Sequence, residues 1–260
     1  MNAVLERLLT TEVVTQPDGT PAPLHSAITA EEGRALQRLI RAHRPTTTLE
    51  VGLAYGVSAL FICDALVEVG GRQHITVDPL QREWGNVGLR HLDEAGFGSL
   101  VEHHEAPSFR VLPALEAAGR RIDFAFIDGW HTFDYALVDF FYVDRLLTVG
   151  GILVIDDAWS YPALRKLVRY IARHRRYTPV DTGIAAAPPS GRPLFDTLTA
   201  PLRRFASGRR AARLFHPALL TPDSTLHLPA HDLVAFSKTA DDVLGDGTGN
   251  SRRWDQHIDF

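Results

Sequence analysis

Residues 49–60 of this 260-residue chain read LEVGLAYGVSAL, a strand-like apolar run, two spaced glycines and a helix-like run. Gly52 and Gly56 lie between the two runs in a G-x-x-x-G spacing. Because glycine has no Cβ, the backbone at such a turn can approach a ligand closely. In open α/β sheets the ligand binds near the first turn, outside the carboxyl ends of the strands. The stretch indicates the first strand and ligand-binding turn of an α/β domain, and a tight structural turn is the alternative.

Strand-like and helix-like segments alternate on both sides of this turn. Helices are expected at residues 58–69, 83–96, 107–119, 132–147 and 161–174, after an earlier helix that Thr29 caps and Pro45 ends. Strands are expected at residues 47–53, 74–79, 100–106, 122–129, 150–158, 176–181 and 231–239. Such alternation is typical of an α/β fold with a doubly wound, mostly parallel sheet, here of seven strands.

The alternation of strand-like and helix-like segments, and the places where it stops, divide the chain into five parts. We expect an N-terminal helical arm (1–28), irregular around a Pro-Asp-Gly turn, then a ligand-binding core (29–181), an insertion or cap (182–230), the last core strand (231–240) and a polar tail (241–260). The insertion is rich in Pro, Ser, Gly and Arg, with a helical stretch around Leu202–Phe215. Its arginines suit a solvated helix face, a lid over the site or a docking patch for an anionic group.

Composition narrows the class of protein. Apolar residues make up 45% and charged residues 22% of the chain, which is typical of a globular domain. The formal net charge of −4 offers no field that attracts nucleic acid or an anionic membrane. No apolar run approaches the roughly 20 residues that cross a bilayer. With Cys63 as the single cysteine, no intramolecular disulfide can form, which fits a cytoplasmic protein. The oligomeric state stays open, a homo-oligomer included.

Two acidic residues flank the glycine turn. Glu50 stands at the end of the first strand, where a carboxylate suits a cationic amino group better than a pyrophosphate. Asp78 ends the second strand, a position at which acids accept hydrogen bonds from ribose hydroxyls, although Asp78 before Pro79 could also start a turn. Together they predict an adenosine-containing ligand. The missing G-x-G-x-x-G spacing argues against an NAD-dependent oxidoreductase.

Three more acids are expected at one edge of the sheet. Asp128 ends one strand, and Asp156 and Asp157 end the next strand along the chain. Neighbouring strands lie about 5 Å apart, so the carboxylates should converge and repel one another unless a cation binds. Oxygen ligands suit Mg²⁺. His131, three residues beyond Asp128, can accept a proton near neutral pH. The alternative is that these acids only begin a turn and cap a helix.

These motifs resemble those of class I S-adenosylmethionine (SAM) methyltransferases, above all the catechol O-methyltransferase-like group and related bacterial families. The resemblance covers roughly residues 29–180 and the last strand. It implies that Glu50 binds the methionine part of SAM and that Asp78 binds the ribose. The glycine and serine of the family's turn correspond to Gly52 and Ser58, and its adenine contacts correspond to Ser108 and Phe109.

The resemblance also assigns the catalytic edge. Asp128-Gly129-Trp130-His131 is similar to the family's Asp-x-Trp-Lys segment, so Asp128 and Trp130 would contact the cofactor and His131 would replace the lysine base. Asp156-Asp157 is similar to the family's Asp-Asn metal pair, which Asp128 completes. The chain departs from the family in having His for Lys and Asp for Asn, and it has no clear counterpart of the substrate-side acid. Catechol itself is therefore not implied as the acceptor.

The sequence thus predicts a SAM-dependent, Mg²⁺-assisted O-methyltransferase whose partner is a small phenolic or sugar-like molecule with a hydroxyl group. Two alternatives keep the same fold. In one, methyl transfer needs no metal and the acids are structural. In the other, the chain binds SAM without catalysing a reaction.

Overall fold

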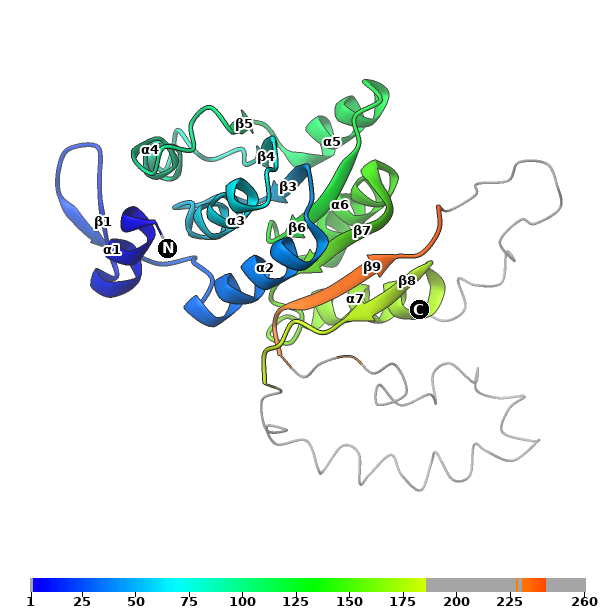
Figure 1. Cartoon of the computed structure of the whole chain (residues 1–260). Coiled ribbons are helices and arrows are strands. Elements are labelled where there is room, and N and C mark those ends of the chain that lie inside the picture. Colours follow the sequence, from blue (N-terminus) through cyan, green and yellow to red (C-terminus); the bar gives the residue numbers. More distant parts are fainter. Residues whose placement is uncertain (1, 186–227, 229–230, 242–260) are drawn as a thin grey trace, which may run out of the picture.

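Strands that are buried on both faces and are mostly apolar form the centre of the molecule. The computed structural model describes residues 2–185, 228 and 231–241. Its main sheet contains β3 (Thr47–Val51), β4 (Gln73–Val77), β5 (Val101–His104), β6 (Ile122–Ile127), β7 (Leu147–Ile155), β8 (Tyr177–Val180) and β9 (Val234–Lys238). The strand order is β5-β4-β3-β6-β7-β9-β8 (Figure 1). The five strands β5, β4, β3, β6 and β7 run parallel to one another, and β9 runs antiparallel to both of its neighbours. The predicted seven-stranded, mostly parallel sheet is therefore confirmed.

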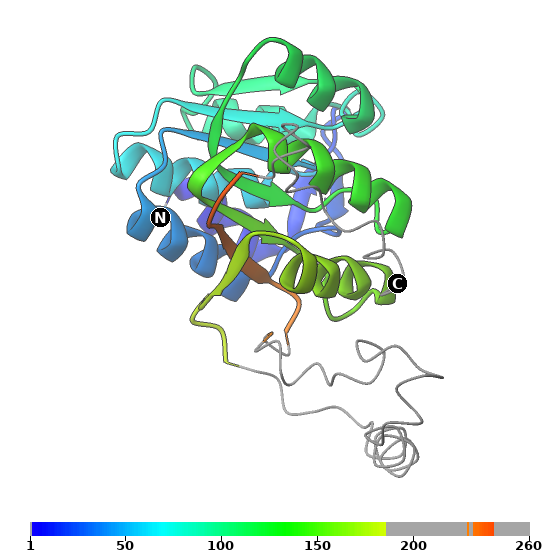
Figure 2. The same cartoon turned by 90° about the vertical axis from the view of Figure 1, so that its right-hand side faces the viewer.

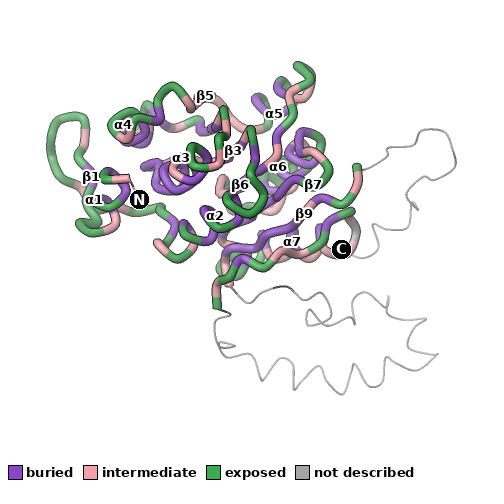
Figure 3. The backbone as a smooth tube through the Cα atoms, in the orientation of Figure 1, coloured by how far each residue is buried: buried purple, intermediate pink, exposed green. Residues whose placement is uncertain are grey.

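Helices cover both faces of this sheet, and each face has its own apolar core. One core joins α2 (Ala30–His43), α3 (Val57–Glu68) and α4 (Val87–Glu94) to the sheet through residues such as Phe124 and Phe126. The other joins α5 (Ser108–Ala117), α6 (Phe133–Leu146) and α7 (Pro162–His174) through residues such as Ala125 and Leu153. Figure 2 shows the layers from the side, and Figure 3 shows that the buried backbone follows the strands. The alternation of side chains along each strand produces the two cores.

The chain preceding α2 is more regular than its turn residues suggest. It forms α1 (Ala3–Thr11) and a short antiparallel hairpin of β1 (Val13–Thr15) and β2 (Pro21–Pro23). Leu5 and Leu8 lie one helical turn apart and are fully buried, while the Asn2 side chain caps the helix by accepting from the Val4 N–H. Arg7 pairs with Glu94 of α4 at 2.8 Å. Burial of this apolar stripe stabilises a helix of only 9 residues.

Two expectations concern individual segments. The capping box of Thr29 and Glu32 begins α2, as the sequence predicts. The expected insertion and tail lie outside the described residues except for residues 182–185, 228 and 241, and Leu202–Phe215 lies wholly outside them.

Among the helices that the structure describes, none has both the length and the apolar character that a membrane span requires.

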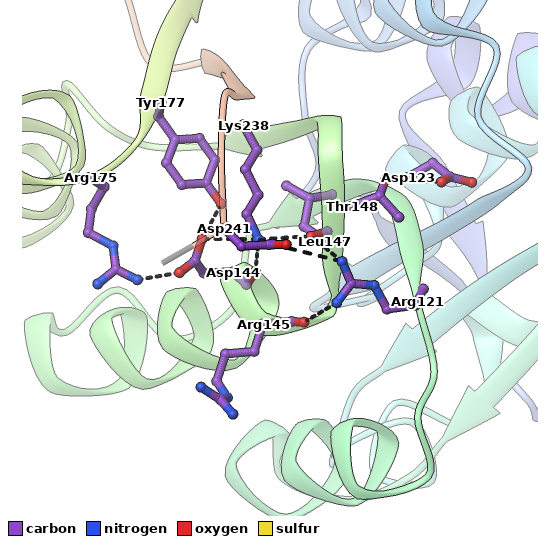
Figure 4. Close-up of polar contacts among 10 residues, drawn as sticks. All are labelled: Arg121, Asp123, Asp144, Arg145, Leu147, Thr148, Arg175, Tyr177, Lys238 and Asp241. Carbon is purple, nitrogen blue, oxygen red and sulfur yellow. Dashed lines mark hydrogen bonds and ion pairs between the residues drawn. The ribbon is translucent and has the colours of Figure 1, made fainter. Parts of the chain in front are cut away.

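A buried ionic network fixes β8 and β9 to the rest of the sheet. Asp144 of α6 accepts a hydrogen bond from the Tyr177 hydroxyl at 2.7 Å and also pairs with the Arg175 guanidinium. The Lys238 ammonium donates to the carbonyl oxygens of Asp144 and Leu147 at 2.6 and 2.9 Å (Figure 4). The Asp144 and Lys238 side chains are only 3% and 2% exposed, so removal of one partner leaves desolvated polar groups behind.

The first prediction tests this network. Asp144→Ala should lower the free energy of unfolding by about 3 kcal/mol, because the charged partner then stays buried without a counter-charge. Urea unfolding measures the loss. Asp134→Ala removes an exposed carboxylate from the first turn of the same helix and serves as the control. Equal losses in the two variants would show that the buried network does not stabilise the fold.

Candidate functional site

The glycine turn lies directly against the end of β6. Gly52 has φ = +94°, and a Cβ at this position would stand 2.0 Å from the carbonyl oxygen of Asp128. Any side chain there would therefore push the two segments apart. Gly56 has φ = +79°, and a Cβ there would meet the backbone of Gly88 at 3.0 Å. The turn is thus held between the end of β6 and the start of α4, and both glycines are required by close backbone approach.

Asp78 lies beside this turn at the end of β4. Its carboxylate accepts the backbone N–H groups of Leu53 and Ala54, both at 2.9 Å, and that of Leu80 at 2.7 Å. The side chain therefore shapes the turn, in addition to any contact with a ligand. Ser58 lies nearby in the first turn of α3 and is 7% exposed.

Glu50 is fully buried at the end of β3. Its Oε2 atom lies 3.2 Å from Nε2 of His74, and its Oε1 atom has no hydrogen-bond partner within the part of the chain that the structure describes. A buried carboxylate oxygen without a donor is costly. The position therefore has an unused acceptor next to the glycine turn.

The ends of β6 and β7 bring two carboxylates and an imidazole together. Nε2 of His131 lies 3.4 Å from Oδ1 of Asp128 and 3.1 Å from Oδ2 of Asp157. One ligand atom from each of these three residues lies within 4.8 Å of the others. Their side chains are 25–30% exposed, so the cluster is open to solvent on one side. This is the cluster of hard donors that the strand ends suggest, but with His131 as its third member.

Asp156 is not a member of that group of three. It is 6% exposed, and its Oδ1 atom has no hydrogen-bond partner among the described residues. Burial, followed by the charge of Asp128 and then of Glu32, raises its carboxyl pKa well above the usual value. Asp156 therefore lies close enough to Asp128 for a charge on one carboxyl to disfavour a charge on the other.

Burial and mutual repulsion dominate the electrostatics of the site. Burial raises the pKa of Asp128 to about 6, with a smaller opposing effect of its hydrogen bond to His131. Burial also raises the pKa of Asp157, whose backbone adopts the left-handed conformation at φ = +55°. The hydrogen bond to Asp128 raises the pKa of His131. These directions show that the site favours additional positive charge, whether it arrives as a proton or as a cation.

Exposed aromatic rings surround the cluster. Trp130 is 63% exposed, and its ring centroid lies 6.5 Å from that of Tyr135, which in turn lies 6.1 Å from Phe109. On the other side, the Tyr161 ring lies 4.4 Å from the His131 ring. Trp130 and Phe109, the two predicted cofactor contacts, thus share one aromatic surface through Tyr135.

Several residues of the site are not evident from the sequence. Asp139 of α6 is 2% exposed, and a Cβ on Gly129 would lie 3.5 Å from its Oδ2 atom. Burial raises the Asp139 pKa to about 6, while a hydrogen bond with Ser108 opposes the rise. Its only signal in the sequence is a carboxylate in the middle of a mostly apolar helix. Asp232 accepts the backbone N–H groups of Trp159 and Ser160 at 3.0 and 2.6 Å, which fixes the loop after Asp157.

The chain is similar to known methyltransferases in sequence. Residues 49–158 match a family model described as a methyltransferase domain. Caffeoyl-CoA O-methyltransferase 2 of Petunia hybrida is 30% identical over 156 residues, which cover 54% of this chain and 61% of that protein. The caffeoyl-CoA O-methyltransferase of Petroselinum crispum is 29% identical over the same length and the same shares. The chain therefore spans about three fifths of the length of these curated relatives.

Solved structures show the same fold. The O-methyltransferase TomG from Streptomyces achromogenes, solved in complex with SAM, superposes with a TM-score of 0.56 at 23% identity, over 69% of this chain and 82% of that one. An O-methyltransferase from Bacillus cereus, solved with SAH, gives a TM-score of 0.56 at 20% identity, over 69% and 83%. Residues 49–158 thus match a methyltransferase domain, and the described chain has the fold of O-methyltransferases solved with SAM or SAH.

Proposed function

We propose that this protein transfers a methyl group from SAM to a hydroxyl oxygen of a small phenolic or sugar-like acceptor, with the help of a divalent cation. The observation that carries the proposal is the cluster of Asp128, His131 and Asp157 next to the glycine turn. The turn is where an α/β sheet of this kind binds its cofactor, and the cluster lies where an acceptor oxygen would meet it.

The residues present fit both the cofactor and a cation. The unpaired Oε1 atom of Glu50, buried at the turn, suits a cationic amino group. Asp128 and Asp157 offer carboxylate oxygens, which Mg²⁺ prefers over nitrogen, and a cation would also relieve the repulsion between Asp128 and Asp156. Because a magnesium ion would select the oxygens, we assign the His131 nitrogen to proton transfer rather than to ligation.

Two bound groups would supply chemistry that the side chains lack. SAM, when bound, supplies an electrophilic methyl group on a sulfonium sulfur. A divalent cation, when bound, stabilises negative charge on the acceptor oxygen. The chain itself must place that oxygen, remove its proton and exclude competing water.

His131 is positioned to take the proton at Nε2. Its ring lies against Tyr161 on one side, and the carboxylates of Asp128 and Asp157 orient the nitrogen and stabilise the charged imidazolium after proton transfer. The aromatic surface of Trp130, Tyr135 and Phe109 lies on the side of the predicted adenine contacts. Glu50 and Asp78 flank the turn, where they would hold the amino and ribose groups of the cofactor.

The first test of this function concerns the cation. Dialysis against a chelator should abolish turnover, and Mg²⁺ should restore it. Asp128→Asn should raise the Mg²⁺ concentration for half-maximal turnover by about tenfold or more, because one charged ligand becomes neutral. Asp134→Asn, with an exposed carboxylate at the start of α6, is the matched control. Full turnover after exhaustive chelation would favour the metal-independent mechanism of the same fold.

The second test concerns the base. His131→Ala should lower kcat by roughly 10²–10⁴-fold, the usual contribution of a general base, while SAM affinity by calorimetry changes little. The residual activity should rise with pH, because the acceptor hydroxyl then ionises without help. A variant that keeps wild-type kcat at neutral pH would exclude His131 as the base. Absence of turnover by the wild-type protein across phenolic and sugar acceptors, despite SAM binding, would favour a non-catalytic role.

The raised pKa of His131 also predicts how stability depends on pH in the metal-free protein. A histidine whose pKa is higher in the folded state contributes stability below its unfolded value of about 6.5 and loses that contribution as the pH rises through the folded value. His131→Ala should therefore destabilise the metal-free protein more near pH 6.5 than at pH 9 in urea unfolding. A difference that does not vary with pH would contradict the pairing with Asp128 and Asp157.

A further inference from the structure

A short row of polar side chains is buried beneath α3, where an apolar core would be expected. Thr48 and Glu50 of β3 lie on the same face as His74 of β4, and Thr48 and His74 are direct neighbours in the parallel register. All three are 0% exposed. Strand residues on this face of β6 are phenylalanines, whereas Thr76, the register partner of Glu50 on β4, is polar and buried, so the polar side chains lie on the β3 and β4 side of this face.

Hydrogen bonds connect the three side chains. Thr48 Oγ1 lies 2.8 Å from Nδ1 of His74, and Nε2 of His74 lies 3.2 Å from Oε2 of Glu50. A carboxylate can only accept, so the proton between His74 and Glu50 belongs to Nε2. The Thr48 hydroxyl lies 3.4 Å from the Gln73 carbonyl oxygen and closer to Nδ1. Donation of its proton to Nδ1 would complete the neutral Nε2–H tautomer of the ring.

This arrangement orients Glu50 through one of its two oxygens. His74 contacts only Oε2, and within residues 2–185, 228 and 231–241 no lysine or arginine forms an ion pair with Glu50. The Glu50 carboxylate also contributes to the raised pKa of the buried Cys63 thiol, after the larger effect of burial. The Oε1 atom remains without a donor among these residues. A buried anion with one free oxygen is a site for a cationic donor.

We propose that His74 is a positioning residue for the cofactor, which fixes Glu50 so that its free oxygen binds the cationic amino group of the amino-acid part. The inference rests on the proposed SAM site and adds a residue that neither touches the cofactor nor lies in its turn. Thr48 acts one step further away, by setting the tautomer of the His74 ring. The row therefore serves recognition of the amino acid and leaves recognition of the adenosine to other residues.

The experiment compares two ligands by calorimetry, SAM and 5′-methylthioadenosine, which keeps the adenosine and sulfur but lacks the amino acid. His74→Phe retains a ring and removes both nitrogens. It should raise the Kd for SAM by about 10–100-fold and leave the Kd for methylthioadenosine within about twofold, because only SAM presents an amino group to Glu50. His74→Gln restores an N–H donor and should recover most of the SAM affinity.

A second Thr–His pair in the same sheet, of which Thr76 is buried and His103 partly buried, provides the control. His103 of β5 lies 2.9 Å from the Thr76 hydroxyl through Nδ1 but has no contact with Glu50 in the described structure. His103→Phe should leave the ratio of the two Kd values unchanged. If His74→Phe does not fold by circular dichroism, Thr48→Val carries the test, with a rise of about 3–10-fold in the SAM Kd alone.

The outcomes separate the inference from the proposed function. Equal weakening of SAM and methylthioadenosine, or unchanged SAM affinity, would overturn the positioning role of His74. A wild-type protein that binds neither ligand would instead overturn the proposed SAM site itself. Selective loss of SAM affinity that His74→Gln restores would establish the role, since a purely structural defect would affect both ligands.

Discussion

The close approach of Gly52 to the carbonyl oxygen of Asp128 is the constraint on which the rest of the site depends. The first turn and the end of β6 cannot occupy their positions if a side chain stands between them. This contact brings the segment that would hold the cofactor against the segment that carries Asp128 and His131. Methyl transfer needs its two reactants at contact distance, and much of the rate enhancement in such reactions comes from that proximity. Gly52 thus sets the distance between the glycine turn and the end of β6 at Asp128, which are 76 residues apart in sequence.

Electrostatics impose a second constraint, because the site brings together more acidic side chains than basic ones. Asp128, Asp156 and Asp157 all have raised pKa values, and burial is the largest cause in each case. His131 provides the one positive partner within the cluster that the structure describes. A proton on His131 and a divalent cation would therefore compete for the same two carboxylates. Such competition would link the protonation of His131 to the binding of a cation by Asp128 and Asp157.

Much of this architecture can be predicted from the sequence because it follows from simple patterns. Apolar runs define the strands, and acids that end neighbouring parallel strands must lie at one edge, as Asp128 and Asp157 do. Other features depend on long-range packing that no local pattern encodes. His74 occurs in an ordinary β-strand pattern, and only the register with β3 shows that it faces Glu50. Likewise, the sequence does not reveal that Asp156 lies outside the group that Asp128, His131 and Asp157 form.

The direction of β9 has a consequence for how a domain of this kind can diversify. Because β8 runs parallel to β7 and β9 runs antiparallel to it, the connection between Val180 and Val234 both leaves and re-enters the sheet at the edge that carries the acids. The Asp144 network anchors these two strands at the opposite edge. The entropy of closing a connection grows only slowly with its length. We therefore expect related chains to differ freely in the length of this connection while the register of β7, β8 and β9 stays fixed.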